Sequence, residues 1–338
     1  MKVKIVELRE RMLNSLVKRG LSQFDAKLLV DAFVEAEMTG KKTHGIGKIF
    51  MLDKPIKNVL GTPKIIKDKG NYALVDGNKT LGHTSADMAT DILIKKVKEF
   101  DNAFVAVTNS YYYSMASIYA KKVADAGYVA IILNNGGPAT ISPFGGNQPI
   151  TGTNPIAIGI PCSAGSIVLD MTTGEKPWGE VNLAKVEKRS LQEKTFYNEA
   201  GVFTTDPADV SAIIPFGGYK GYGLNFMFEI LTGAFVSAKM GLQSMSPYDL
   251  GFFFMAFSSE MFTTKEKFDQ EILKFIEEVK SSRKVAGVDE IYLPGEKSAI
   301  SLKKAESAGE IEIDTSVWER LLEYEKGEDV MSNVGLKT

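Results

Sequence analysis

Hydrophobic positions in the first forty residues recur at the spacing of amphipathic helices. Apolar side chains stand three or four residues apart from Ile5 to Leu16, which places them on one face of a helix. Gly20 predicts the end of this helix, and Ser22 is typical of the N-cap of the next one. A second apolar stripe runs on to Gly40, so the chain is expected to begin with a helical portion.

The pattern changes after Pro63, where short apolar runs are bounded by Gly, Asn, Pro or Ser. Such runs predict buried strands, which fall at residues 72–77, 103–107, 128–133, 155–160 and 167–169. Helical patterns cover residues 85–99, 115–126 and 265–280, and residues 224–236 predict a buried helix. The fold class is therefore α/β, with helical N- and C-terminal portions.

Composition narrows the class of partner. The net charge of -2 gives no reason to expect nucleic acid or an anionic membrane. No stretch approaches 18 apolar residues, and the charged N-terminus does not resemble a signal peptide. Cys162 is the one cysteine, so neither a disulfide nor a thiolate metal site is expected, which suits a reducing cytoplasm.

Only two histidines are present, His44 and His83. This scarcity nearly excludes a histidine zinc site, and no metal is expected. It also leaves few places for acid–base chemistry near pH 7. His44 is the first candidate, because it stands between Thr43 and Gly45, where a glycine gives a ligand room to approach. Its imidazole could transfer a proton, although a histidine that merely caps a helix end is the alternative.

A second candidate site is the glycine-rich run at residues 215–223, which precedes an apolar helix. Four glycines and Lys220 at a helix N-terminus suit an anion such as a pyrophosphate, because backbone N–H groups and the helix dipole favour negative charge. A tight structural turn is the alternative. The chain has neither a Rossmann Gly-x-Gly-x-x-Gly opening a βαβ unit nor a P-loop.

Polar and glycine-rich segments also follow the predicted strands. Residues 170–176 contain hydroxyls and acids at a strand end, where ligands commonly bind in α/β folds, and a hydroxyl-capped turn is the alternative. The loop that contains Asn135 is long and rich in glycine and proline, which favours a substrate site. Tyr111, Tyr112 and Tyr113 could line a pocket, but aromatic packing is expected for at least two of them. Residues 293–297 alone would predict a surface loop.

Taken in order, these segments resemble the type-2 malate/L-lactate dehydrogenase family, which includes ureidoglycolate and sulfolactate dehydrogenases, a diketogulonate reductase and a piperideine-carboxylate reductase. The resemblance covers nearly the whole chain. The matching motifs are Thr43-His44-Gly45, residues 152–161 (GTNPIAIGIP), Asp170-Met171-Thr172-Thr173, residues 204–207 (TTDP), residues 215–224, residues 249–251 (DLG) and residues 293–296 (LPGE).

The resemblance implies a non-Rossmann NAD(P)H-binding fold, NAD or NADP as cofactor, and a homodimer with the active site near the subunit interface. It implies catalysis by His44 with Thr43 and Tyr112, and substrate binding by Lys48, Asn135 and Thr153. The implied cofactor contacts are Asp170, Thr172, Thr173, Lys176, Lys220, Gly221, Gly295, Glu296 and Lys297. The corresponding domains are a helical portion at residues 1–70 with the catalytic histidine, a central cofactor- and substrate-binding α/β domain at 71–260, and a C-terminal portion at 261–338 that completes the cofactor site.

Tyr112 and Lys48 depart in their chemistry from the family pattern. Tyr112 stands where the family has a second histidine, and a tyrosine, with an ordinary pKa of about 10, is a poor base at pH 7. Lys48 stands where the family has an arginine, so the charge is kept but the bidentate fork is lost. Thr43 replaces a serine and keeps a hydroxyl.

The function expected is hydride transfer to or from C2 of a small 2-oxo or 2-hydroxy acid. Reduction of an imine is the alternative that the two departures motivate. A catalytically idle relative that binds a nucleotide is a third possibility, which the loss of the second histidine favours and the presence of His44 and Lys220 opposes.

Overall fold

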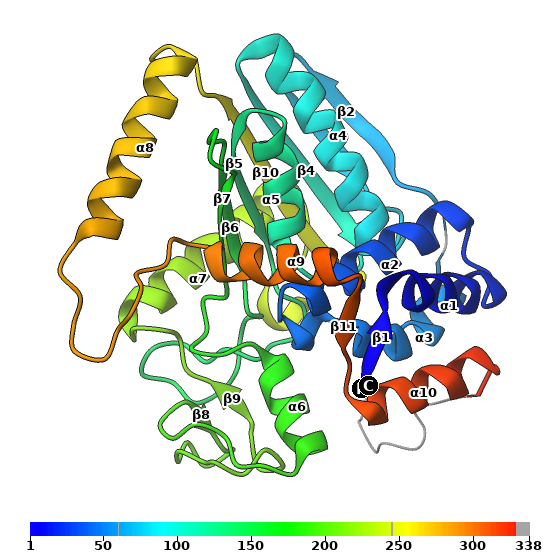
Figure 1. Ribbon diagram of the computed structural model, residues 1–338. Helices are drawn as coiled ribbons and strands as arrows, with labels where there is room; N and C mark the ends of the chain where they lie inside the picture. Colours follow the sequence, from blue (N-terminus) through cyan, green and yellow to red (C-terminus); the bar gives the residue numbers. More distant parts are fainter. Residues whose placement is uncertain (60, 245, 329–338) are drawn as a thin grey trace. The chain divides into compact units, whose positions relative to one another are not determined.

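The computed structural model describes residues 1–59, 61–244 and 246–328, and it divides the chain into two compact units. The first unit joins Met1–Leu60 to Glu296–Thr338 and so contains both ends of the chain. The second is the continuous segment Gly61–Gly295. Their elements confirm the predicted α/β class with helical N- and C-terminal portions (Figure 1).

Helices dominate the first unit. α1 (Ile5–Lys18) buries Leu8, Met12 and Leu16, as the spacing predicts, and α2 (Gln23–Met38) packs against it. The Ser22 side chain accepts a hydrogen bond from the Asp25 N–H at 3.0 Å, so the predicted N-cap is confirmed. The other helices of this unit are η1 (Lys42–His44), η2 (Ile46–Met51), α3 (Asp53–Lys57), α9 (Glu296–Ala308) and α10 (Thr315–Glu325).

A short antiparallel ladder joins the two chain segments of this unit. β1 (Lys2–Lys4) pairs with β11 (Glu310–Glu312), and buried Val3 lies opposite buried Ile311. The backbone N–H of Ile5 also donates to the Gly309 carbonyl at 3.0 Å. The N-terminal helices are thus fastened to residues from the far end of the sequence.

The second unit is built on a seven-stranded sheet with the order β2-β3-β4-β10-β5-β6-β7. Only β3 and β4 are parallel; every other neighbouring pair is antiparallel. A mixed sheet of this kind differs from the parallel sheet of a Rossmann fold. Its strands are β2 (Lys64–Lys69), β3 (Tyr72–Asp76), β4 (Asn102–Ser110), β5 (Tyr128–Asn134), β6 (Ile156–Ile160), β7 (Ile167–Met171) and β10 (Leu250–Ser258).

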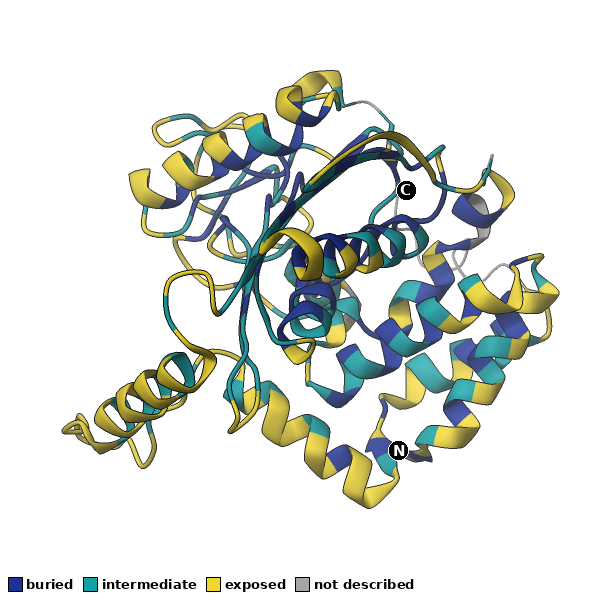
Figure 2. Ribbon diagram, turned by 90° about the horizontal axis from the view of Figure 1, so that it is seen from above, coloured by how far each residue is buried: buried dark blue, intermediate teal, exposed yellow. Residues whose placement is uncertain are grey.

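Side chains of the central strand β10 alternate between two cores. Phe252 and Phe254 belong to the core beneath α4 (Gly82–Phe100) and α5 (Ala116–Asp125). Phe253 packs with Phe228 of α7 (Tyr219–Thr232) in the other core. Figure 2 shows buried positions along the strands and on one side of several helices. The sheet is therefore covered on both faces.

The remaining elements extend from this sheet. A small core around Phe196 and Val181 holds α6 (Trp178–Glu187) beside β8 (Phe196–Tyr197) and β9 (Ala212–Ile213). Two short 3₁₀ helices follow α7: η3 (Ala234–Val236) and η4 (Gly241–Gln243). The predicted amphipathic helix is α8 (Lys265–Ser281), which buries no residue and is mostly exposed in Figure 2. No helix within the described ranges is long and apolar enough to cross a membrane.

Candidate functional site

His44 lies in the short 3₁₀ turn η1, which follows α2 in the first unit. Its Nδ1 is 2.9 Å from the Thr43 hydroxyl, so the two residues that the sequence singles out form a pair. His44 is half-buried, which leaves its ring partly accessible to a ligand. The hydroxyl can fix the orientation of the imidazole, and an oriented imidazole can deliver or accept a proton.

A half-buried acid that the sequence analysis missed supports this turn. Glu37 Oε1 accepts a hydrogen bond from the Ile46 N–H at 3.0 Å, and a Cβ built on Gly45 would lie 2.2 Å from the same oxygen. Gly45 therefore allows the carboxyl to pack directly against the backbone beside His44. Burial raises the pKa of Glu37 above its ordinary value. The only signal in the sequence is an acid within an otherwise apolar helix face.

Lys48 follows in η2 of the same unit and is half-buried. Burial lowers the pKa of its ammonium, because desolvation disfavours the charged form. A desolvated ammonium gains more from an anionic partner than a fully hydrated one does. Lys48 is therefore suited to bind a carboxylate, as a single charge without the fork of an arginine.

The other histidine offers no comparable group. His83 lies in the first turn of α4, and only 4% of it is exposed. Burial lowers its pKa to about 3, so the ring is neutral near pH 7. His83 is thus part of the core, and acid–base chemistry by an imidazole rests on His44.

The three consecutive tyrosines of the second unit have different surroundings. Tyr113 is buried and its hydroxyl hydrogen-bonds Asn134, while Tyr111 packs on Tyr248 with ring centroids 5.1 Å apart. Tyr112 is half-buried, hydrogen-bonds Ser114 and lies near Asp170. Burial, with a smaller contribution from the Asp170 charge, raises the pKa of Tyr112, so its hydroxyl is neutral at pH 7.

Close backbone packing fixes the position of the tyrosine loop. A Cβ on Gly82, at the start of α4, would lie 2.1 Å from the Tyr111 carbonyl oxygen. On the other side, Asp170 Oδ2 accepts a hydrogen bond from the Ser117 N–H at 3.1 Å, at the N-terminal end of α5. A carboxylate is favoured at a helix N-terminus, and here it joins the end of β7 to α5.

Thr153, Thr172 and Thr173 come together, although the sequence predicts different ligands for them. The Thr153 carbonyl oxygen accepts hydrogen bonds from the Thr172 hydroxyl at 3.0 Å, the Thr173 hydroxyl at 2.8 Å and the Thr173 N–H at 3.0 Å. The predicted cofactor turn after β7 is therefore tied to the loop before β6. Lys176 is half-buried three residues later.

The glycine-rich run is attached to the same place. The Phe216 N–H donates to the Thr173 carbonyl at 3.1 Å, and Gly217 and Gly218 adopt positive φ angles of 55° and 65° just before α7. A Cβ on Gly221 would lie 2.3 Å from the Phe216 carbonyl oxygen, so glycine is required there. No side chain of the described residues caps the N-terminus of α7, and Lys220 is exposed in its first turn. An uncapped helix end with a lysine fits an anionic phosphate.

Asn135 is placed differently from the expected substrate ligands. Its Oδ1 accepts from the Gly251 N–H at 2.8 Å, and its Nδ2 donates to the Lys239 carbonyl at 3.2 Å. Only 3% of the residue is exposed. Its side chain therefore holds the loop against β10 and against the segment that follows η3. Contact between Asn135 and a substrate stays a prediction.

The residues of the predicted C-terminal cofactor motif belong to different units. Gly295 belongs to the second unit, where a Cβ would lie 2.4 Å from the Val168 carbonyl of β7. Glu296 and Lys297 begin α9 of the first unit. Within the described residues, no three acid, histidine or cysteine side chains come together as metal ligands.

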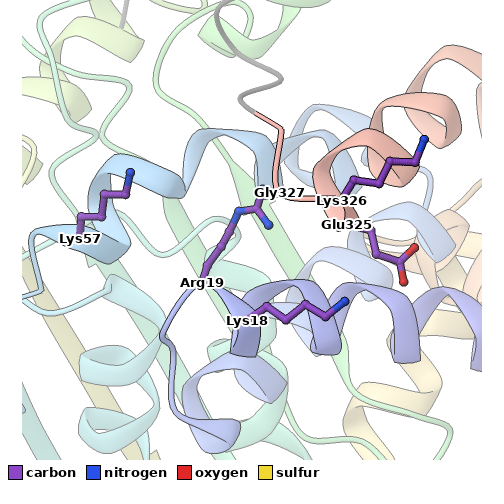
Figure 3. Close-up of a pocket in the computed structure, with 6 residues that line it drawn as sticks. All are labelled: Lys18, Arg19, Lys57, Glu325, Lys326 and Gly327. Carbon is purple, nitrogen blue, oxygen red and sulfur yellow. The ribbon is translucent and has the colours of Figure 1, made fainter.

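A separate cavity of about 330 Å³ lies in the first unit (Figure 3). It is lined by Lys18, Arg19, Lys57, Glu325, Lys326 and Gly327. These residues lie at the C-terminal ends of α1, α3 and α10, where cations are favoured by the helix dipoles. Glu325 pairs with Arg11 at 2.8 Å, and the Arg19 guanidinium lies over the Tyr324 ring. The cavity contains none of the predicted site residues.

Known proteins resemble this chain over most of its length. It is 32% identical over 327 residues to malate/(S)-sulfolactate dehydrogenase of Methanothermus fervidus, with 93% of each chain covered. It is 28% identical over 335 residues to ureidoglycolate dehydrogenase (NAD(+)) of Escherichia coli, with 95% of each covered. Identity to a Δ1-pyrroline-2-carboxylate/Δ1-piperideine-2-carboxylate reductase of Pseudomonas putida is 28% over 241 residues, covering 69% of this chain and 70% of that protein.

The fold gives the same result. Sulfolactate dehydrogenase of Methanocaldococcus jannaschii matches with a TM-score of 0.85 at 30% identity, covering 100% of this chain and 98% of that one. The family model described as malate/L-lactate dehydrogenase matches residues 3–322. The family predicted from the ordered motifs is confirmed: this chain is an oxidoreductase that belongs to the malate/L-lactate dehydrogenase family.

Proposed function

We propose that the protein transfers a hydride between NAD(P)H and C2 of a small 2-oxo or 2-hydroxy acid. The observation that carries the proposal is the α7 N-terminal loop with Lys220, hydrogen-bonded to the turn at Thr172 and Thr173 within a chain of this family. A bound nicotinamide coenzyme supplies or accepts the hydride. NAD and NADP are both compatible with the described residues, and the name of the ureidoglycolate relative favours NAD.

The α7 end provides the binding of the coenzyme phosphates. Backbone N–H groups at Tyr219 and Lys220, the dipole of α7 and the Lys220 ammonium all favour negative charge there. Thr172 and Thr173 support the loop from the side of β7. Asp170, Lys176, Gly221, Gly295, Glu296 and Lys297 are the further contacts that we assign to the coenzyme.

His44 delivers the proton to the substrate oxygen or nitrogen in reduction, and removes it in oxidation. Thr43 orients the ring through the 2.9 Å contact with Nδ1. Lys48 binds the substrate carboxylate. Burial lowers the pKa of Lys48, and the negative charge of a bound carboxylate favours the charged ammonium again. We assign Thr153 and Asn135 to the substrate loop.

The second candidate function is reduction of a cyclic or open-chain 2-imino acid. The specific observation is Tyr112, a neutral hydroxyl beside Asp170 at the position of the family's second histidine, together with the pyrroline-carboxylate reductase relative. An imidazolium would favour a substrate with a negatively charged side chain. The uncharged Tyr112 does not, so it suits a substrate whose side chain is neutral. Tyr112 would then contact the substrate by hydrogen bonding and not by acid–base catalysis.

We further propose that the enzyme is a homodimer through the outer face of α7. The sequence predicts a buried helix there, but the structure buries only one side of it. The outer side is apolar and exposed, with Tyr219, Leu224, Phe226, Met227 and Ile230. Apolar clusters of this kind mark interaction surfaces, and an interface on α7 would bring the Lys220 end near the partner. A cytoplasmic location goes with the single cysteine.

The decisive experiment is a panel of 2-oxo acids, each with and without ammonia or methylamine, followed by NADH and NADPH absorbance. Turnover of a 2-oxo acid without amine supports the first function. Turnover that requires the amine, or that proceeds with a preformed cyclic imine, supports the second. No oxidation of either coenzyme with any member of the panel would contradict both.

A further inference from the structure

Glu229 is a buried acid on the inner side of α7, and none of the roles above uses it. Only 7% of the residue is exposed, and burial raises the pKa of its carboxyl. Both oxygens accept hydrogen bonds: Oε2 from Asn154 Nδ2 at 2.6 Å and Oε1 from the Gly241 N–H at 2.7 Å. The carboxyl thus joins α7 to Asn154, 75 residues earlier in the sequence, and to Gly241, 12 residues later.

Asn154 connects Glu229 to the substrate loop. It is fully buried and has a φ of 34°, in the left-handed region. Its Oδ1 accepts from the Gly136 N–H at 2.8 Å, and its Nδ2 also donates to the Asn225 carbonyl at 3.2 Å. An asparagine held in this conformation fixes the neighbouring peptide, whose Thr153 carbonyl receives the bonds from Thr172 and Thr173.

Asn225 makes a second attachment one helical turn earlier. Its Nδ2 donates to the Thr173 hydroxyl at 2.8 Å and to the Gly152 carbonyl at 3.0 Å. Its Oδ1 accepts from the Thr151 hydroxyl at 2.6 Å. Because residues 225 and 229 are four apart, they lie on the same face of α7. The helix is therefore held to residues 151–154 and to Thr173 at two successive levels.

A buried ionisable network is a weak source of stability, since apolar side chains of similar volume often serve as well. What directional hydrogen bonds supply is a defined register between the parts that they join. Here the two parts are the turn at Thr172 and Thr173 and the helix α7. Lys220 lies near the start of this helix, about 13 Å along its axis from Glu229. A slip of α7 would displace its N-terminus relative to that turn.

We propose that Glu229, with Asn154 and Asn225, is a positioning network that sets coenzyme affinity by holding the N-terminus of α7 in register with the Thr172–Thr173 turn. The inference rests on the proposed coenzyme role of Lys220. None of the three residues needs to touch the coenzyme or the substrate. The network acts on binding, so substrate turnover at saturating coenzyme is expected to change little.

The test compares Glu229→Gln with Thr232→Ala, by coenzyme fluorescence titration, kcat and KM, and thermal unfolding. A glutamine at 229 presents an NH2 to one of two donors, Asn154 Nδ2 or the Gly241 N–H, and so leaves a donor unsatisfied. Thr232 is also a buried residue of α7, but among the described residues its hydroxyl bonds only the Phe228 carbonyl of its own helix. Both variants should lower the Tm, whereas only Glu229→Gln should weaken NAD(P)H binding, by about tenfold.

Glu229→Asp provides a further check, because it keeps the charge and should recover part of the coenzyme affinity that Glu229→Gln loses. Should Glu229→Gln fail to fold, Thr151→Val can be used in its place. It removes the hydroxyl that donates to Asn225 Oδ1, and it should still weaken coenzyme binding measurably. Equal coenzyme affinity in the Glu229→Gln and Thr232→Ala variants, or an unchanged affinity in Thr151→Val where Glu229→Gln does not fold, would overturn the proposal.

The Lys220→Ala variant distinguishes failure of the positioning network from failure of the proposed coenzyme role of the Lys220 loop. An unchanged coenzyme affinity in Lys220→Ala contradicts the coenzyme role of the loop, and with it the reason for the network. A weakened affinity in Lys220→Ala with a normal affinity in Glu229→Gln leaves the loop's role intact and rejects only the positioning network.

Discussion

The carboxyl of Glu37 packs against the Cα of Gly45, where an added Cβ would lie 2.2 Å from Oε1. This contact sets the path of the chain immediately after His44. The carboxyl oxygen also accepts a hydrogen bond from the Ile46 N–H, so displacement of Glu37 weakens a partly buried hydrogen bond.

Gly45→Ala should therefore move the Glu37 side chain and disturb the His44 turn. We expect the free energy of unfolding to fall by about 1–3 kcal/mol, as in other overpacked sites, and kcat to fall more than coenzyme affinity. Gly47→Ala is the matched control, because a Cβ at Gly47 meets no atom within 4 Å. Chemical denaturation and steady-state kinetics measure both; equal behaviour of the two variants would refute the role of the contact.

The raised pKa of Glu37 makes a prediction about pH. A carboxyl whose folded pKa lies above its unfolded value binds protons more tightly when folded, so its contribution to stability is present at low pH and lost as pH rises. The loss should begin near the ordinary value of 4.5 and finish above the folded pKa. Glu37→Gln removes this titration and keeps an acceptor for the Ile46 N–H, so its stability relative to the unmodified protein should improve from pH 4 to pH 7. Denaturant titrations at several pH values test this, and a difference that does not change with pH would contradict it.

His44→Ala should lower kcat by about 100-fold or more, because it removes the group assigned to proton transfer. Coenzyme affinity should change little. Thr43→Val should have a smaller effect in the same direction, since it removes only the 2.9 Å contact to Nδ1. Steady-state kinetics decide the matter, and near-normal turnover by the His44 variant would mean that the proton comes from elsewhere.

Lys220→Ala should weaken NAD(P)H binding by about 1.5–3 kcal/mol, the usual contribution of a charge-assisted hydrogen bond. Lys185→Ala, which removes an exposed lysine from α6, controls for the change in net charge. Fluorescence titration at fixed ionic strength measures both. If Lys220→Ala binds coenzyme as tightly as the control, the glycine-rich run is a structural turn.

Tyr112 and Lys48 together predict a change of substrate preference. A neutral phenol and a compact ammonium should reshape the pocket without preventing the chemistry, so malate and lactate should be poor substrates. The double change Tyr112→His and Lys48→Arg should raise kcat/KM on ordinary 2-oxo acids. Malate or lactate as the best substrates of the unmodified protein would show that this interpretation of the two positions is wrong.

Local pattern predicted most of the strands whose burial is visible in a short stretch of sequence, although the apolar run of β10 (Leu250–Ser258) was missed. β4, β5, β6 and β7 are short apolar runs between turn residues, and all four were predicted. β2 was missed because its six residues are all exposed and half of them are lysines. The place of β10 between β4 and β5 is a long-range pairing that no periodicity in the sequence expresses.

The candidate site divides in the same way. Thr43, His44 and the glycine-rich run are visible because glycines and rare residue types stand out. Glu37, Asn225 and Glu229 are not, because a polar residue in an apolar helix gains meaning only from its partners, and the same holds for Asn154 in the loop before β6. Asn225, for example, joins Thr151, Gly152 and Thr173, which lie more than fifty residues away in the sequence.

The pairing of β1 with β11 has a consequence for how the protein is made. Residues 2–4 leave the ribosome long before their partners at 310–312 are added. The N-terminal helices must therefore wait, with apolar faces uncovered, while the sheet of Gly61–Gly295 is completed. Contacts so distant in sequence form slowly, so the unit that carries His44 is expected to be the last to fold and the one that most needs protection by chaperones during translation.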